Sequence, residues 1–231
     1  MKTSPFTRVC YFLILLILPS QVIAQSDEAL LFTHPATKMQ LKTLSAQLNL
    51  GRSASGDFTQ YRQLKVLKKP LVSRGTFLFD QGNGLIWQQL HPFTSSLILK
   101  KNQLIQIDSQ GNIQIQTAGN VAAASALETM MPSLLTAMLT GDIKQLEQNF
   151  SLSFQQQKQQ WQLGLIPKDP IVAKVLPKMI IEGQQTISAL ILLSKNGDTS
   201  RIELSNLQNR PLTADELTRF TPSAADNVSP H

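Results

Sequence analysis

The chain has 231 residues, of which 42% are hydrophobic and 16% are charged, and its formal net charge is +6 at pH 7. This length suits one domain of the barrel or sandwich type with a sizeable core. The mild basicity is spread along the chain without any basic-aromatic motif, which argues against nucleic acid as a partner.

The first 24 residues have the order of a secretory signal peptide. Lys2 and Arg8 give a basic start, Val9–Leu18 is an unbroken apolar run, and Val22–Ala24 fits the cleavage position. The apolar run is shorter than the roughly 20 residues that a membrane-spanning helix needs. We therefore expect cleavage after Ala24 and export to the periplasm. The alternative is an uncleaved membrane anchor.

The mature chain is expected to form a single domain over residues 25–221. A small polar tail at residues 222–231 is expected to be disordered. Cys10, the only cysteine, lies inside the leader, so the mature chain has no disulfide. A disulfide-free exported domain of this size is typical of a bacterial periplasm.

The mature chain opens with a predicted helix over Ala36–Asn49, because three leucines recur at the spacing of one helical face: Leu41, Leu44 and Leu48. Gly51–Gly56 is rich in small and turn-forming residues and is expected to end the helix. Phe58–Leu67 alternates loosely and predicts a first strand.

Five short runs with strand character follow, separated by turn residues. Such regular spacing predicts an antiparallel meander, and hence a curved sheet or barrel. An antiparallel sheet can be apolar on one face and solvated on the other. The five runs are Gly75–Asp80, Gly84–Leu90, Thr94–Lys100, Gln103–Asp108 and Asn112–Gln116.

After Gly119 the apolar residues recur at the spacing of a helix. Pro132 is tolerated in a first helical turn but not in an interior, so we expect two pieces, Val121–Met131 and Ser133–Leu139. A short helix at Ile143–Gln148 is expected next. Strands then resume, with a strong Asn-Gly hairpin signal before the last one: Phe150–Gln155, Trp161–Ile166, Met179–Glu182, Thr186–Ser194 and Thr199–Leu207.

The sequence carries no recognisable catalytic or cofactor motif. No Gly-x-Ser-x-Gly elbow or glycine-rich phosphate loop occurs, and His34, His91 and His231 lack metal-ligand spacing. We therefore expect no enzyme activity, no cofactor and no metal. Two basic clusters, Lys65–Lys69 and Lys100–Lys101, fit a solvated sheet edge or attraction to anionic headgroups or an acidic partner.

Large, soft apolar side chains recur on the expected strands and helices, and methionine adapts well to irregular apolar partners. This pattern fits either a packed core or a lipid cavity. If the sheet face covered by the helices encloses a cavity, we expect these residues to bind lipid: Phe58, Phe77, Phe79, Leu85, Trp87, Leu97, Leu99, Met131, Leu135, Met138, Trp161 and Met179.

Several ordered segments resemble the LolA-type periplasmic carriers of outer-membrane lipoproteins. The helix Met39–Leu50 and the Phe-Thr-Gln segment Ser55–Gln60 resemble the family's opening. Gly75–Phe79, followed by Leu85–Trp87, resembles its central signature, and Met131–Leu135 resembles its proline-started lid helix. The ending Phe220–Pro222 also fits, so the resemblance spans most of the mature chain.

The resemblance implies an α+β, mainly β fold, in which a half-open antiparallel β-barrel is covered by a helical lid. It also implies a monomer that holds acylated lipoprotein or lipid cargo, taken from an inner-membrane donor complex and delivered to an outer-membrane acceptor. One departure concerns the arginine that helps to latch the family's lid. Asp80–Gly84 contains no arginine, and Ile86 stands directly before Trp87, so we expect the latch to be altered in this chain.

A periplasmic carrier of acyl chains is the function that these features favour. The alternative is a lipid- or lipoprotein-sensing regulatory module with a similar half-barrel. An extra partner-binding domain would favour the sensor, and a catalytic cluster in the folded chain would favour an enzyme.

Overall fold

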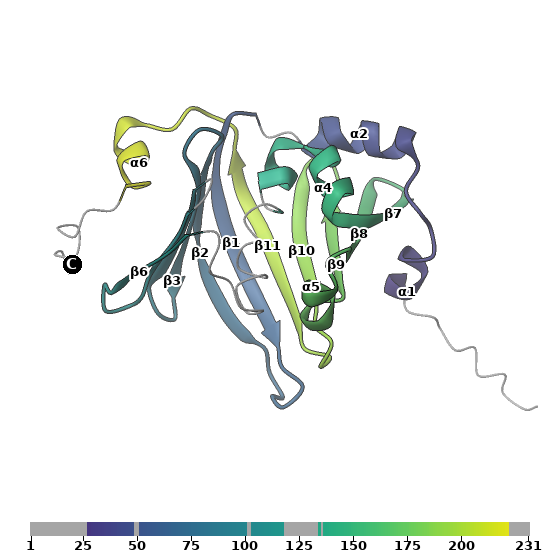
Figure 1. Cartoon of the computed structure of the whole chain (residues 1–231), viewed down its shortest axis with the longest axis horizontal. Coiled ribbons are helices and arrows are strands. Elements are labelled where there is room, and N and C mark those ends of the chain that lie inside the picture. The colour runs from purple at the N-terminus through teal and green to yellow at the C-terminus, as the bar shows by residue number, and fades with distance from the viewer. Residues whose placement is uncertain (1–26, 49–50, 101–102, 118–133, 135, 222–231) are drawn as a thin grey trace, which may run out of the picture.

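One antiparallel sheet of eleven strands organises the chain (Figure 1). A computed structural model describes residues 27–48, 51–100, 103–117, 134 and 136–221. The predicted signal peptide, the helix Val121–Met131 and the polar tail lie outside these residues.

The strands form two consecutive meanders, in which each strand pairs with the next along the chain. The first meander contains β1 (Ser53–Gln63), β2 (Leu71–Asp80), β3 (Gly84–His91), β4 (Ser95–Lys100), β5 (Gln103–Ile107) and β6 (Ile113–Thr117). The second contains β7 (Phe150–Gln157), β8 (Gln160–Pro167), β9 (Lys178–Gly183), β10 (Ile187–Leu193) and β11 (Thr199–Gln208).

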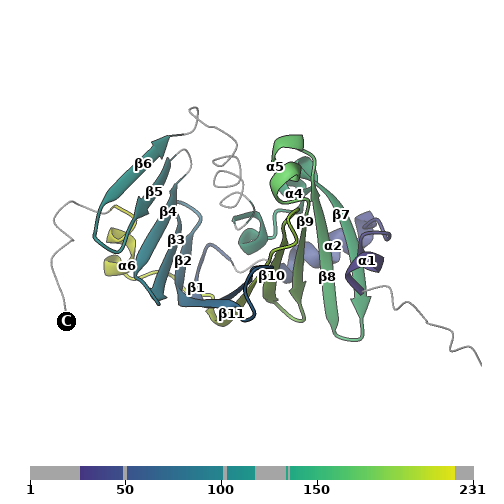
Figure 2. The same ribbon diagram turned by 90° about the horizontal axis from the view of Figure 1, so that it is seen from below.

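Pairing of β1 with β11 joins the two meanders into one sheet, with Gln63 opposite Thr199 and Phe58 opposite Leu204. The strand order runs from β6 through β1 and β11 to β7, so β6 and β7 form the two edges and the sheet is not closed. Figure 2 shows it bent into an open trough, with β1 and β11 at the bottom. The predicted half-open antiparallel barrel is therefore confirmed.

Short helices surround this trough. α4 (Ile143–Asn149) and α5 (Pro170–Val175) lie on its inner side, and α1 (Asp27–Leu31) and α6 (Ala214–Thr218) lie outside it (Figure 2). α2 (Lys38–Leu48) crosses one end of the second meander (Figure 1). Residues 134 and 136–140 are also helical, in agreement with part of the predicted piece Ser133–Leu139.

The predicted opening helix is confirmed as α2. Its three predicted core leucines are all buried: Leu41, Leu44 and Leu48. Thr37 and Gln40 cap its start reciprocally, since the Gln40 side chain accepts from the Thr37 N–H at 2.8 Å and the Thr37 hydroxyl accepts from the Gln40 N–H at 3.3 Å.

The predicted bounds of the first strand are wrong. β1 begins at Ser53, inside the expected turn, because Ser53–Gly56 pairs with Phe77–Asp80 of β2. It ends at Gln63, and Leu64–Leu67 forms a turn closed by the Leu67 N–H and the Leu64 carbonyl at 3.0 Å. Small residues suit this end of β1 because a large side chain from β2 needs the space above it.

Three short helices were not predicted, although two carry clear capping signals. Asp169 caps α5 with Pro170 in its first turn, and Thr213 and Glu216 form a capping box on α6. α1 has five residues and no cap of this kind among its described contacts. Its position depends instead on packing of Leu31 and Phe32 against Gly164 of β8.

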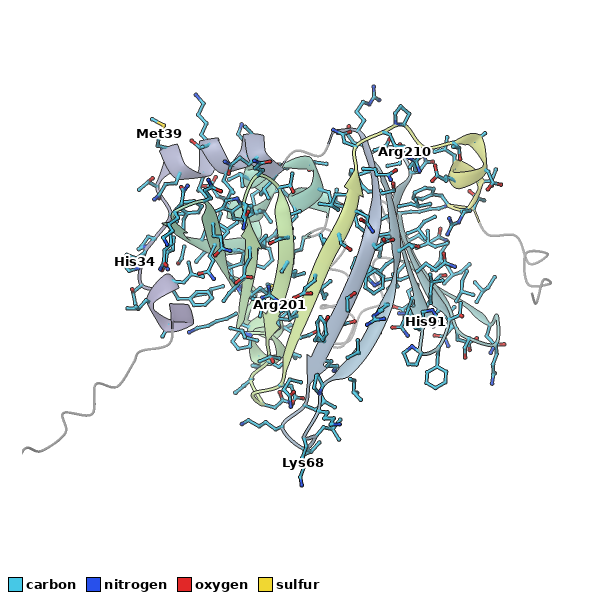
Figure 3. All side chains as sticks on the ribbon, turned by 180° about the vertical axis from the view of Figure 1, so that it is seen from behind. His34, Met39, Lys68, His91, Arg201 and Arg210 are labelled. Carbon is cyan, nitrogen blue, oxygen red and sulfur yellow. The ribbon has the colours of Figure 1, made fainter. Side chains whose placement is uncertain are left out.

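Both faces of the sheet are partly covered. On the outer face, Phe220 packs with Leu78, Ile86, Ile98 and Ile105, and Leu212 packs against this cluster, while Leu31 packs with Ile180 and Ile191. Between these two apolar areas the outer face is polar. Figure 3 shows Arg201 there, and its guanidinium contacts Glu182 and Glu203 at 2.9 Å each.

An ion pair fixes the segment that carries α6. The Arg210 guanidinium contacts Glu216 at 2.7 Å, and the Thr213 N–H donates to the same carboxylate at 2.8 Å. These hydrogen bonds, with that from Arg210 the strongest, lower the pKa of Glu216 from 4.5 to about 2. Ionised Glu216 therefore stabilises α6 above pH 4.5, and this contribution is lost as the pH falls towards 2.

We predict that the Glu216 carboxyl carbon titrates near pH 2 in an NMR pH series of the folded chain. In Arg210→Gln the midpoint should rise towards 4.5, because the charged donor has been removed. A midpoint near 4.5 in the unaltered chain would show that the ion pair does not form in solution.

Candidate functional site

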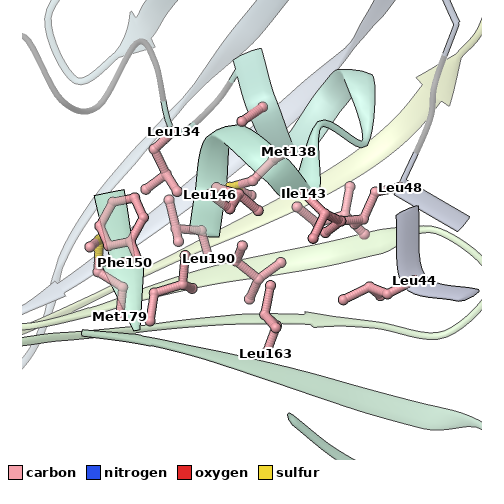
Figure 4. Close-up of a cluster of buried hydrophobic side chains, with 14 of the residues drawn as sticks. Leu44, Leu48, Leu134, Met138, Ile143, Leu146, Phe150, Leu163, Met179 and Leu190 are labelled. Carbon is pink, nitrogen blue, oxygen red and sulfur yellow. The ribbon is translucent and has the colours of Figure 1, made fainter. Parts of the chain in front are cut away.

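The inner face of the trough carries the largest apolar surface of the described chain. Its main cluster joins the second meander to α2, to α4 and to the helical turn at residues 136–140 (Figure 4). Met138 and Met179 are both fully buried there, on the helical turn and on β9. Soft methionine side chains on both sides of this contact allow it to repack around a different apolar partner.

A second apolar cluster lines the first meander and contains Phe77, Phe79 and Leu139. The two clusters meet at Trp87, which packs against both. The rings of Phe58 and Trp87 are stacked with centroids 3.9 Å apart, and Phe77 lies on Trp87 at 6.2 Å. Three aromatic rings from β1, β2 and β3 thus form a continuous platform where the sheet bends.

Two glycines make room for this platform. Gly75 pairs with Phe58 and Gly56 pairs with Phe77 across β1 and β2. A Cβ at Gly75 would lie 2.8 Å from the Phe58 ring, and one at Gly56 would lie 2.8 Å from the Phe77 ring. Each phenylalanine therefore leans over a strand position that has no side chain. This role of the two glycines was not predicted, although the alternation of glycine and phenylalanine on facing strands carries the signal.

A hollow of about 300 Å³ opens beside the platform on β3 to β6. Trp87 and Leu97 are half-buried at its apolar side, while Gln89, Gln106 and Gln114 supply amides. The inner face therefore changes from apolar to polar along the strands. Such a boundary suits an amphiphilic molecule better than a wholly apolar one.

Ten of the twelve predicted lipid-binding residues lie on this inner face. The structure buries Phe58, Phe77, Phe79, Leu85, Leu99, Met138, Trp161 and Met179, and leaves Trp87 and Leu97 half-buried. Met131 and Leu135 lie outside the described residues. The described part of the face is thus packed by its own side chains, so a bound acyl chain would have to displace some of them.

The turn at Asp80 is stabilised by hydrogen bonds within the turn and by one from Ser53 of β1. Burial opposes ionisation of Asp80, but hydrogen bonds from Ser53, Asn83 and Gly82 outweigh it and lower the pKa of this carboxyl. Ser53 donates at 2.8 Å and the Asn83 side chain at 2.7 Å. Among the described residues, the Asp80 side chain makes no hydrogen bond to the helical turn at residues 136–140.

Ile86, the residue directly before Trp87, belongs to the apolar cluster of the outer face. It is buried on the outer face with Phe220, on the opposite side of the sheet from Met138. The residue before Trp87 therefore contributes to the packing of Phe220 on the outer face.

Within the described ranges, no three histidine, cysteine, aspartate or glutamate side chains gather as a metal site. No helix in the same ranges has both the length and the apolar character needed to cross a membrane.

Comparison with known proteins gives one family. The family model described as "Outer membrane lipoprotein carrier protein LolA" matches residues 50–221. Among solved structures, a LolA superfamily protein from Nitrosomonas europaea is similar, with 12% identity, a TM-score of 0.44, and coverage of 78% of this chain and 96% of its own. A DUF1329 family protein from Desulfovibrio piger has 10% identity, a TM-score of 0.43, and coverage of 78% and 94%. No curated protein matches.

We predict that Gly75→Ala lowers the free energy of unfolding by about 1–3 kcal/mol, because the added methyl would lie 1.9 Å from the Gln88 carbonyl of β3 and 2.8 Å from the Phe58 ring. Gly82→Ala is the matched control, since its nearest atom would be 3.3 Å away in an exposed turn. Urea denaturation measures both. Equal stability of the two variants would show that neither the Phe58 ring nor the neighbouring β3 backbone requires a glycine at position 75.

Proposed function

The chain belongs to the LolA family, and we propose that it binds the acyl chains of a lipoprotein or related lipid on the inner face of its half-barrel. One observation supports this above the others. The two inner apolar clusters meet at a half-buried tryptophan beside an open hollow, so an apolar chain has a continuous route inward.

The proposal requires the inner face to open. Each acyl methylene that moves from water into an apolar environment stabilises binding by about 0.8 kcal/mol. The apolar trough provides such an environment. The elements over the face are short, since α4 has seven residues, and a helix of this length is not stable by itself. Its attachment depends on contacts of Ile143 and Leu146 with the sheet, and an acyl chain can replace such contacts with its own.

In the full proposal, residues 25–221 act in the periplasm as a monomeric carrier after removal of the leader. The chain takes acylated cargo from an inner-membrane donor complex and gives it to an outer-membrane acceptor. No catalytic step is assigned to it. A sensing module would bind the same chains without delivering them, so transfer between donor and acceptor vesicles distinguishes the two functions.

We predict that Trp161→Phe, which leaves Trp87 as the only tryptophan, reports acyl binding by a change in its emission. A 16-carbon fatty acid that buries about ten methylenes should bind in the low-micromolar range. Butyrate is the matched control, because it has the carboxylate without the long chain. Unchanged emission, together with no displacement of a fluorescent fatty acid, would contradict the proposal.

We predict that Met138→Ala lowers the free energy of unfolding by about 2–5 kcal/mol, because Met138 is fully buried. The same variant should bind the fatty acid more tightly, since the helical turn at 136–140 is held less firmly. Met39→Ala on α2, where the side chain is 74% exposed, is the control. Lower stability with unchanged acyl affinity would mean that this turn is a fixed part of the core.

A further inference from the structure

A second hollow, of about 680 Å³, opens at the end of the trough where α5 meets β1, β10 and β11. This is the lower end in Figure 1, and Lys68 marks the same end in Figure 3. Arg62, Lys174 and Lys195 line the hollow from β1, α5 and the turn after β10. The Lys195 N–H donates to the Val175 carbonyl at 3.2 Å, which holds that turn against α5.

Lys174 and Lys195 are without a partner among the described residues, whereas Arg62 interacts electrostatically with Asp198, whose pKa is lowered mainly by the hydrogen bond from the Lys65 N–H and less by the Arg62 charge. No hydrogen bond or ion pair of the described chain involves the side chain of Arg62, Lys174 or Lys195, whereas Arg201 and Arg210 are both paired with glutamates. Asp198 is the single acidic residue lining the hollow. Its oxygens already accept hydrogen bonds from the Lys65 N–H at 3.0 Å and the Asn196 side chain at 2.8 Å.

The floor of the hollow is apolar and continues into the core. Leu176 is 2% exposed and belongs to the main inner cluster, and Leu192 packs against that cluster. Gln60 and Ser200, joined at 2.7 Å, form a polar wall on the side of β1 and β11. A molecule in the hollow would therefore have cations at its outer end and leucines at its inner end.

We infer that this hollow binds the anionic headgroup of an amphiphile whose acyl chain lies on the inner face, an inference that rests on the proposed function. The chemistry fits a phosphate group, because a guanidinium donates to its oxygens bidentately and lysines add point charges. With three cations and one carboxylate, the hollow attracts an anion more strongly than a zwitterion. The inference thus assigns the cargo a class, an acylated molecule with an anionic headgroup.

Calorimetric titration with two amphiphiles of equal chain length tests this assignment. Dodecyl phosphate and dodecylphosphocholine share a chain and a phosphate, but only the first carries a net negative headgroup. Each exposed ion pair is weak by itself, so the three cations together should make dodecyl phosphate bind about tenfold more tightly than dodecylphosphocholine. The triple variant R62Q/K174Q/K195Q should reduce this preference to less than about twofold.

The matched control is K38Q/K42Q/K144Q, which removes the same charge from exposed positions on α2 and α4 that do not line the hollow. It should keep the preference. Equal binding of the two amphiphiles to the unaltered chain would overturn the inference, as would an equal loss of preference in both triple variants. Binding of neither amphiphile would overturn the proposed function as well.

Titration with inorganic phosphate distinguishes a site for a lipid headgroup from a site for a free anion. It should bind far more weakly than dodecyl phosphate, because it gains nothing from the leucine floor. If inorganic phosphate binds as tightly as dodecyl phosphate, the hollow is a free-anion site and the lipid assignment is wrong.

Discussion

The pairing of β1 with β11 is the contact on which the rest of the structure depends. It brings together strands from opposite ends of the described chain, with Asp57 opposite Ser205 and Gln63 opposite Thr199. Without it, the two meanders would be separate sheets with two more exposed edges, which are prone to unwanted pairing. With it, their apolar faces form one continuous inner surface.

The bend of the trough places the aromatic platform and the two hollows on this shared surface. Phe58 belongs to the same strand that pairs with β11, and it reaches Trp87 of β3 across Gly75. The inner face is then covered by short helical pieces whose contacts are mostly apolar. Apolar contacts lack directional hydrogen bonds, so an acyl chain can replace them at a small difference in free energy. The reversible lipid binding that we propose for this face requires such a balance.

Much of the fold could be predicted from local patterns, and the rest depends on contacts between distant segments. Strand alternation and turn residues predicted β3 to β6 closely, and the helical leucine spacing predicted α2. The start of β1 could not be predicted, because the small residues there are explained by neighbours on other strands, with Phe77 of β2 and Leu207 of β11 both close to Gly56. The alternation of side chains along the strands placed the predicted lipid-binding residues on one face of the sheet. It did not show that Ile86 lies on the other face. The basic hollow combines side chains from three distant segments, which no local pattern brings together.

The most direct test of the central claim uses the methionine methyl groups as reporters of where an acyl chain lies. Stearic acid with a spin label near its methyl end is added to the chain labelled with ¹³C at the methionine methyls. Acyl binding on the inner face predicts strong broadening of Met138 and Met179, which are buried there, and little change at the exposed Met39. Broadening of Met39 alone, or of none of the three, would contradict the account.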